Sequence, residues 1–354
     1  MVQANKGKKI IGLSCGSKNG NCETYLKAAA MGAEEFGVET EIIRAMELKV
    51  LPCRGCGGCN PKDKPFDITR VHTGKCVLKD DVEWILQKTM VEDAALIIGV
   101  PCYHIRANGY LMCINDRMLP FFRRDPSVLN KTRVGAIIAV GGSGYDAWAS
   151  LTLPTVNIFL QHTRILVDQM LVTNSGYREW NLWLQQKNKT LTSHTHLARV
   201  EDLEWSKVLE LWPGQEEPLN FKRKALERAK ELGQNVARAM DLPPEEVKYI
   251  GEQSGVSCPV CHCSVMVVPE NLPHVYCPVC AVRGVISIDN SNMKVVWNEH
   301  DAKNPRFSAV HIDHHFSKKG KIIEEKQLRD AKAIEELVKG FSSHGKLIRP
   351  LVKS

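Results

Sequence analysis

Short β-branched, apolar runs alternate with helix-length amphipathic segments through the first 245 residues, and this alternation constrains the fold more than any other feature. It is typical of parallel strands joined by crossover helices in a doubly wound α/β sheet. The predicted strands are Lys9 to Ser14, Val38 to Arg44, Ala94 to Val100, Arg133 to Val140 and Arg164 to Val172. The predicted helices are Cys22 to Phe36, Asp81 to Glu92, Tyr110 to Phe122, Ala147 to His162 and Leu219 to Met240. Ligands of such folds bind at the carboxyl ends of the strands.

Composition narrows the classes of protein that remain. The 354 residues include 44% hydrophobic and 25% charged side chains, enough for one large core or two smaller ones. The first apolar segment, Ile10 to Leu13, is too short for a signal peptide or a membrane span, so we expect a cytoplasmic protein. The thirteen cysteines then indicate metal or redox chemistry rather than structural disulfides. The formal net charge of +7 is scattered and favours anionic cofactors at least as much as nucleic acid.

Three cysteines lie at two-residue spacing in the sequence CRGCGGC, and a fourth follows after sixteen intervening residues. They are Cys53, Cys56, Cys59 and Cys76. Thiolates at this spacing suit an iron–sulfur cluster better than a disulfide framework, and the glycines would let the backbone wrap a cluster. Free or redox-active thiols and a zinc ion are the alternatives that the residues leave open. The isolated Cys15, Cys102 and Cys113 are interpreted as ordinary buried cysteines.

A second cysteine group follows Pro243 and Pro244, which end the last helix and indicate a domain boundary. Two CxxC pairs with β-rich flanks, 15 residues apart, are the pattern of a zinc ribbon. The ligands would be Cys258, Cys261, Cys277 and Cys280. A rubredoxin-like iron site is the alternative, and Cys263 could compete as a ligand. The predicted domains are 1–245, a small β-rich zinc ribbon at 246–300, and a tail at 301–354 with a helix near 322–341.

The ribbon has few basic residues and no stripe of basic and aromatic side chains, so protein docking or dimer stabilisation is favoured over nucleic-acid binding. Three histidines follow in the tail, His311, His314 and His315. They could bind metal or line the active site of a neighbouring subunit, and the plainer interpretation is that they are exposed polar residues.

The loop after the first predicted strand has the sequence SCGSKNGNCET, which is dense in small hydroxyl and amide side chains and opens a helix. Such a loop can present backbone N–H groups and a helix N-terminus to one phosphate. The loop lacks both a dinucleotide GxGxxG motif and a Walker motif, so a mononucleotide fits better. The alternative is an ordinary strand-to-helix turn with a capped helix.

Further loop motifs follow in order along residues 9–240. They are GKCVLKDD at 74–81, PCYH at 101–104, NGYL at 108–111, NDR at 115–117 and VGGSGY at 140–145. Together with the phosphate loop and CRGCGGC, they resemble the flavodoxin-like NAD(P)H-dependent FMN reductase family, in its iron–sulfur flavoprotein branch. The resemblance implies a five-stranded flavodoxin-like sheet, bound FMN, a [4Fe–4S] cluster on the first four cysteines, NAD(P)H bound transiently over the flavin, and a homodimer or homotetramer.

The resemblance also assigns cofactor contacts. Around the FMN phosphate it places Ser17, Lys18, Asn21 and Cys22, with Ser14 and Thr24 as further candidates. Along the flavin ring it places Pro101, Cys102, Tyr103 and His104, with Gly141, Gly142 and Tyr145 on the third loop. Tyr103 and His104 are the candidate catalytic residues, and His104 is also a candidate proton donor. The chain departs from the family where Cys22 replaces the usual Thr, where Met112 replaces a frequent Lys, and in the long Cys59 to Cys76 interval.

The sequence therefore predicts an FMN-dependent oxidoreductase, driven by NAD(P)H or ferredoxin, that passes electrons through FMN and an iron–sulfur cluster to a small organic acceptor. One alternative is an electron-transfer flavoprotein that serves a partner redox enzyme. Another is a redox-sensing or docking protein whose thiolate sites respond to oxidants or metal.

Overall fold

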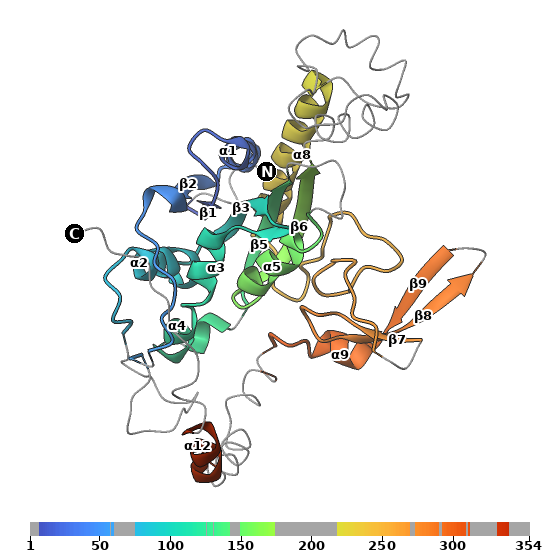
Figure 1. Ribbon diagram of the computed structural model, residues 1–354. Coiled ribbons are helices and arrows are strands. Elements are labelled where there is room, and N and C mark those ends of the chain that lie inside the picture. Colours follow the sequence, from blue (N-terminus) through green and yellow to red (C-terminus); the bar gives the residue numbers. More distant parts are fainter. Residues whose placement is uncertain are drawn as a thin grey trace, which may run out of the picture.

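The computed structural model describes the chain in separate stretches (Figure 1). They are residues 7–56, 58–59, 75–124, 126–129, 131–141, 149–173, 218–269, 273–289, 292–308, 311 and 331–339. Within these residues, no helix combines the length and the apolar character needed to cross a membrane.

The main sheet has the strand order β2-β1-β3-β5-β6, in which all neighbours are parallel, and a short β4 pairs with the end of β3 in the antiparallel sense. The strands are β1 (Lys9–Ser14), β2 (Glu39–Arg44), β3 (Ala95–Tyr103), β4 (Arg106–Ala107), β5 (Arg133–Gly141) and β6 (Arg164–Thr173). The first seven residues of β3 are buried, as expected for a central strand covered on both faces. This order is that of flavodoxin-like folds and confirms the predicted sheet.

Helices cover both faces of the sheet (Figure 1). On one face, α1 (Asn21–Glu34) and the long α8 (Pro218–Ala239) share an apolar core with alternate strand residues. On the other face, the core is shared by α2 (Val82–Leu86), α3 (Gly109–Asn115), α4 (Leu119–Arg124) and α5 (Thr152–Leu160). Short turns complete the set: η1 (Ala45–Glu47), the π-helical η2 (Gln87–Val91) and η3 (Pro126–Leu129).

Two glycines let α1 and α8 approach closely. A Cβ atom at Gly32 would lie 2.1 Å from the Lys230 carbonyl oxygen, and one at Gly233 would lie 1.8 Å from the Ala29 carbonyl oxygen. No side chain fits at either position, so glycine is what allows the backbones of these helices to touch. This contact fixes the far end of the chain's last long helix against the helix that follows the phosphate loop.

One predicted helix is split. The segment expected to be a single helix from Tyr110 to Phe122 forms α3 and α4, with a break at residues 116–118. Pro120 explains the break, because it has no N–H to donate to the carbonyl of residue 116 and its ring would crowd that carbonyl. The break brings Arg117 into a buried position, 3% exposed, which matters for the cysteine loop.

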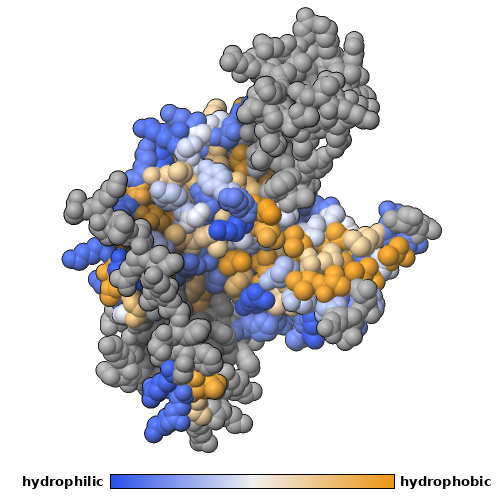
Figure 2. Space-filling model, in the orientation of Figure 1, coloured by the Kyte–Doolittle hydropathy of each residue, from blue (hydrophilic) through white to orange (hydrophobic). Residues whose placement is uncertain are grey.

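The C-terminal part forms a three-stranded antiparallel sheet of β7 (His274–Tyr276), β8 (Arg283–Asp289) and β9 (Asn292–Trp297), followed by α9 (Glu299–Lys303). Of the two β-rich flanks of the cysteine pairs, residues 285–288 lie within β8, whereas residues 265–268 contribute a single bridge, Val267 to Tyr276. Apolar side chains gather on the surface of this arm (Figure 2), including Ile288 and Val296, which are 73% and 65% exposed. The described part of the predicted tail helix is α12 (Ala331–Lys339).

Candidate flavin and metal sites

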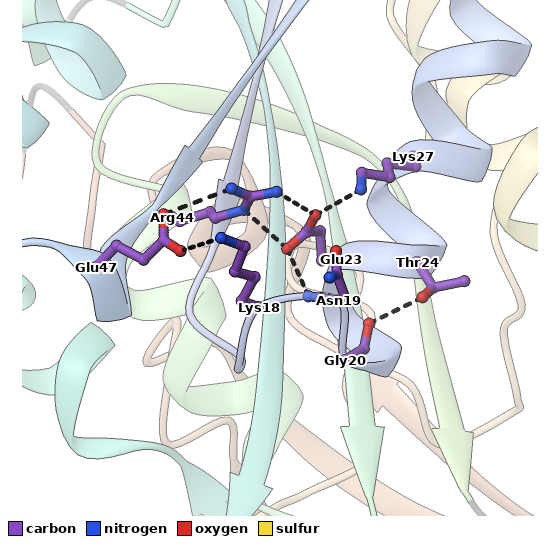
Figure 3. Close-up of polar contacts among 8 residues, drawn as sticks. All are labelled: Lys18, Asn19, Gly20, Glu23, Thr24, Lys27, Arg44 and Glu47. Carbon is purple, nitrogen blue, oxygen red and sulfur yellow. Dashed lines mark hydrogen bonds and ion pairs between the residues drawn. The ribbon is translucent and has the colours of Figure 1, made fainter.

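The phosphate loop is shaped by a buried carboxylate. Glu23 on α1 is 1% exposed, and its Oε2 accepts the backbone N–H of Asn19 at 3.0 Å (Figure 3). Arg44, at the end of β2, binds the same carboxylate through Nη2 at 2.8 Å and Nε at 3.0 Å. Lys27 adds a contact of 2.6 Å. The hydrogen bond from Arg44 is the main reason that the pKa of Glu23 falls to about 2, so this carboxylate stays ionised. The ionised carboxylate holds Asn19, whose backbone is left-handed with a φ of 56°.

The start of α1 has the features of a phosphate site. Its N-cap residue is Gly20, which offers no side-chain cap to the N–H groups of the first turn. Ser14, at the end of β1, is fully buried, and its hydroxyl oxygen has no hydrogen-bond partner among the described residues. A buried orphan hydroxyl at the start of this loop and an uncapped helix N-terminus at its end fit an anionic group that accepts hydrogen bonds from both. The residues present therefore fit the FMN phosphate.

The other predicted phosphate residues differ in how they face this site. Ser17 and Lys18 are exposed, and Lys18 Nζ lies 3.6 Å from Glu47 Oε1. The Thr24 hydroxyl donates to the Gly20 carbonyl at 2.9 Å, so its proton is used within the helix. Cys22 is buried against the loop, and a Cβ atom added to Gly16 would lie 2.8 Å from the Cβ atom of Cys22. Burial raises the pKa of the Cys22 thiol to about 12. A neutral thiol at this position packs the loop from below.

A lysine 201 residues further along the chain reaches the same place. Lys222 on α8 donates through Nζ to Asn21 Oδ1 at 2.7 Å and to the Tyr25 hydroxyl at 3.2 Å. It also lies over the Tyr25 ring. Sequence reasoning did not find Lys222, because 201 residues separate it from Asn21 and no local motif marks it. The cation adds positive charge at the helix N-terminus.

The second flavin loop is a tight hairpin between β3 and β4. His104 and Ile105 occupy its two turn positions with φ of 51° and 74°, the pattern of a type I′ turn. Pro101 is buried, Cys102 is half-buried, and Tyr103 is 53% exposed next to the exposed His104. The turn thus presents Tyr103 and His104 outward at the carboxyl edge of the sheet.

A buried amide joins this loop to the phosphate loop. Asn108 caps α3 by accepting the Leu111 N–H, and its Nδ2 donates to the Cys15 carbonyl at 2.6 Å. It was part of the motif that suggested the family, but no role was assigned to it from the sequence. On the third loop, Gly141 is buried at the end of β5, while Gly142 and Tyr145 lie outside the described residues.

The loop of the first three cysteines is held by the two motifs that follow it. Asp80 and Arg117 form an ion pair whose side chains are 0% and 2% exposed, and Asp80 Oδ2 also accepts the Leu51 N–H at 2.9 Å. Asp81 Oδ2 accepts the Lys49 N–H at 2.8 Å. Burial opposes the charge on Arg117, but hydrogen bonds with Asp80 and Cys76 raise its pKa. The GKCVLKDD and NDR motifs therefore clamp the chain just before Cys53.

The cysteines themselves lie at the surface. Cys53 and Cys56 are exposed, and Cys59 and Cys76 are half-buried. The Gly55 N–H lies 3.5 Å from Cys53 Sγ, and a Cβ on Gly58 would lie 2.8 Å from the Val77 side chain and 3.6 Å from Cys56 Sγ. The loop thus packs directly against the segment that carries Cys76, and most of the intervening insert, 60–74, lies outside the described residues. Backbone N–H groups, glycines and a nearby guanidinium fit a cluster held by thiolates.

The second cysteine group is compact and buried. The ligand atoms of Cys258, Cys261, Cys277 and Cys280 all lie within 4.8 Å of one another, and they form the one such set of three or more His, Cys, Asp or Glu side chains among the described residues. The four cysteines are at most 1% exposed. None of the thirteen cysteines, all of which lie in the described part, forms a disulfide. Four thiols around one point suit a single tetrahedral ion, whereas a four-iron cube would hold its ligands farther apart.

The two CxxC knuckles have the same backbone geometry. In the first, the His262 N–H bonds to the Cys258 carbonyl, and in the second, the Ala281 N–H bonds to the Cys277 carbonyl, each at 2.9 Å. His262 and Ala281 both have left-handed φ, 54° and 59°. Neither residue is glycine, so the repeated conformation reflects the demands of the knuckle. In the tail, His311 is exposed, and His314 and His315 lie outside the described residues.

The sheet order, the uncapped helix after β1 and the outward hairpin after β3 define a flavodoxin-like class of protein. Residues 8–175 match the family described as NADPH-dependent FMN reductase. An iron–sulfur flavoprotein from Methanocaldococcus jannaschii is 32% identical over 45% of this chain and 75% of that protein. One from Methanosarcina thermophila is 34% identical over 38% of this chain and 64% of that protein, just under two thirds of its length. The chain belongs to this family of flavin-dependent oxidoreductases, in its iron–sulfur flavoprotein branch, which confirms the resemblance.

Two further similarities extend across the C-terminal part. A protein named flavone synthase cfoJ, from Aspergillus candidus, is 25% identical over 85% of this chain and 84% of its own length. A solved structure titled flavone reductase has a TM-score of 0.60 and 20% identity, over 96% of this chain and 100% of that one. The structural likeness establishes that the fold of that protein is shared across the sheet and the ribbon region.

Proposed function

We propose that this protein is an FMN-dependent oxidoreductase that takes electrons from NAD(P)H or ferredoxin and delivers them to a small conjugated organic acceptor. The observation that carries the proposal is the loop between the orphaned, buried Ser14 hydroxyl and the uncapped start of α1, which Asn108 joins to the segment that follows the exposed hairpin of Tyr103 and His104. FMN, when bound, supplies a ring that can exchange a hydride or single electrons. The protein supplies the phosphate loop, the hairpin and control over which molecule approaches.

Within this proposal, Glu23 and Arg44 hold the phosphate loop in shape, and Lys222 and the helix N-terminus add positive charge for the phosphate. Tyr103 and His104 are the side chains that face an approaching acceptor, because the type I′ turn directs them outward. His104 is the candidate donor of a proton to the acceptor.

We further propose that Cys53, Cys56, Cys59 and Cys76 hold a [4Fe–4S] cluster. Family membership in the iron–sulfur flavoprotein branch supports this, as do the Gly55 N–H directed at Cys53 Sγ and the clamp of Asp80 and Arg117. A cluster would add single-electron transfer to the chemistry of the site. For the compact group at Cys258, Cys261, Cys277 and Cys280, we propose one zinc ion, since a buried, closed set of four thiolates is the usual structural zinc site.

An organic acceptor is favoured over a protein partner by the similarities that cover nearly the whole chain. The names of both those proteins concern a flavone, which is a flat aromatic ketone. We therefore propose an acceptor with a double bond conjugated to a carbonyl group. The net reaction adds two electrons and two protons to that acceptor, taken from NAD(P)H and solvent, and releases NAD(P)⁺. An electron carrier that serves a partner enzyme remains the second candidate, favoured by the exposed cysteine loop.

The experiment is anaerobic titration of the purified yellow protein. We expect NADH or NADPH to bleach the flavin, and flavone or a quinone to restore the colour. Bleaching by reduced ferredoxin alone would select the electron carrier, and a colourless protein would refute the proposal. Tyr103→Phe with His104→Gln should slow only the recovery step, by about 100-fold or more if His104 donates the proton. Tyr276→Phe, in the ribbon strand β7, is the matched control and should behave as the unsubstituted protein.

A further inference from the structure

The four-cysteine site is joined to the body of the protein by a network of buried amides. Asn157 on α5 donates to Cys263 Sγ at 3.5 Å, and Cys280 Sγ lies 3.6 Å from Gln161 Oε1. Gln169 on β6 donates to the Cys261 carbonyl at 3.1 Å. The first knuckle therefore contacts β6 and α5, and the second contacts Gln161, the C-cap residue of α5.

The same amides bind each other. Asn157 Nδ2 donates to Gln169 Oε1 and Gln161 Nε2 donates to Asn157 Oδ1, each at 2.9 Å. Asn157, Gln161 and Gln169 are 0%, 3% and 6% exposed. Buried amides are costly when they lack partners, and Gln161 Oε1 and Gln169 Nε2 keep the partners given above only while the knuckles stay in position. Leu153 and Ile158 of α5 add apolar contacts to the cysteine cluster.

The opposite end of α5 holds the flavin hairpin. The Leu151 N–H donates to the Ile105 carbonyl at 3.1 Å, and the Thr152 hydroxyl contacts the same oxygen at 3.3 Å. The Ala107 N–H donates to the Thr155 hydroxyl at 3.1 Å. These three contacts surround a turn in which β-branched Ile105 has a φ of 74°, a conformation that persists only where neighbouring structure enforces it.

Helix α5 therefore spans two sites. It has nine residues, which at 1.5 Å per residue makes it about 13 Å long. Figure 1 shows it, in green, between the sheet and the C-terminal segment in orange. Its first turn contacts the hairpin, and its middle and end contact the knuckles.

We propose that the metal ion bound by Cys258, Cys261, Cys277 and Cys280 is a positioning element for the flavin site. It fixes both knuckles, the knuckles fix α5 through Asn157 and Gln161, and α5 holds Tyr103 and His104 in the turn that faces the acceptor. This inference rests on the proposed zinc site and on the proposed role of the hairpin. The ion takes no part in electron transfer.

The test compares hydrogen exchange in full-length protein with and without the metal. Cys258→Ser combined with Cys277→Ser removes one ligand from each knuckle. We expect this variant to lose the zinc found in the unsubstituted protein and to exchange the amides of Ala107 and Leu151 at least tenfold faster. The amides of β1 should keep their protection, which shows that the sheet is folded. The control is Cys113→Ser, which replaces a half-buried cysteine outside both groups. It should retain zinc, and the amides of Ala107 and Leu151 should exchange as slowly as in the unsubstituted protein.

A second variant, Asn157→Leu combined with Gln161→Leu, removes both side-chain links from the knuckles to α5 while leaving the four ligands intact. It should retain zinc and still show faster exchange at Ala107 and Leu151, and it serves if the double serine variant fails to fold. Loss of zinc with unchanged exchange in the hairpin would overturn the proposal, as would unsubstituted protein that contains no metal at this site. Flavin content and bleaching by NAD(P)H are measured on the same samples. A protein that lacks flavin but shows the exchange pattern would refute the proposed function and leave the structural link standing.

Discussion

Replacing Asp80 with asparagine tests how the cysteine loop is held. Asp80 and Arg117 are almost completely buried, and the pair bridges the Leu51 backbone through the Leu51 N–H to Asp80 Oδ2 at 2.9 Å and Arg117 Nη1 to the Leu51 carbonyl at 3.3 Å. Asp80→Asn keeps the shape of the side chain and removes its charge. The guanidinium of Arg117 is then buried without the counter-charge of Asp80. It still contacts the carbonyl of Leu51, two residues before Cys53.

The size of the effect follows from burial. Removing one partner of a buried ion pair typically costs about 3–5 kcal/mol, so we expect Asp80→Asn to lower the free energy of unfolding by that amount. The exposed pair of Lys9 and Glu41 provides the contrast, because its side chains are 30% and 50% exposed. Lys9→Met should leave the free energy of unfolding almost unchanged. A double variant with Arg117→Met should regain part of the loss, because it removes the unpaired charge.

Two measurements check this prediction. Urea unfolding, followed by circular dichroism, gives the free energy, and iron analysis after anaerobic purification reports whether the cysteine loop still holds its cluster. We expect Asp80→Asn to lose most of its iron while retaining FMN, since the phosphate loop is built from other residues. A loss of less than about 1 kcal/mol together with unchanged iron would show that the ion pair does not hold the loop.

Three further predictions concern the flavin site and the core. Asn108→Ala removes the cap of α3 and the donor to the Cys15 carbonyl. It should lower the free energy of unfolding by about 1–2 kcal/mol and weaken FMN binding in a fluorescence titration. Unchanged values would contradict the bridging role of Asn108. The pKa of Glu23 is about 2, below its ordinary 4.5, so its contribution to the loop is complete above pH 4.5 and is lost as the pH falls toward 2. FMN affinity should fall over that range, whereas Glu23→Gln should bind weakly even at neutral pH. Gly233→Ala places a methyl group 1.8 Å from the Ala29 carbonyl oxygen and should cost about 1–3 kcal/mol or more, whereas Gly109→Ala, which meets nothing within 4 Å, should be tolerated.

The sheet was predictable because its strands are short runs rich in β-branched apolar residues, and amphipathic, helix-length segments separate them. β1 begins and ends at the predicted residues, Lys9 and Ser14, and the other four parallel strands differ from prediction by only a few residues. Helix ends were less predictable where tertiary structure decides them. The break between α3 and α4 depends on Pro120, and the same break lets Arg117 reach Asp80.

The candidate sites were predictable only as motifs. The sequence indicated which loops carry the phosphate and cysteine residues, but not what holds them. Lys222 contacts Asn21 from 201 residues away. Asn108 joins two loops through one amide. Glu23 on α1 shapes the phosphate loop and is held by Arg44 on β2. The spacing of residues within a motif does not predict such contacts, because they form only when the chain is folded.

We propose that one chain combines a flavin with two separate thiolate sites. The most direct test is the quantification of FMN, iron and zinc in a single anaerobically purified sample. We expect about one FMN, about four irons and about one zinc per chain, with iron lost in Cys53→Ala plus Cys56→Ala and zinc lost in Cys258→Ser plus Cys277→Ser. A sample without FMN, or iron that persists in the first variant, would contradict it.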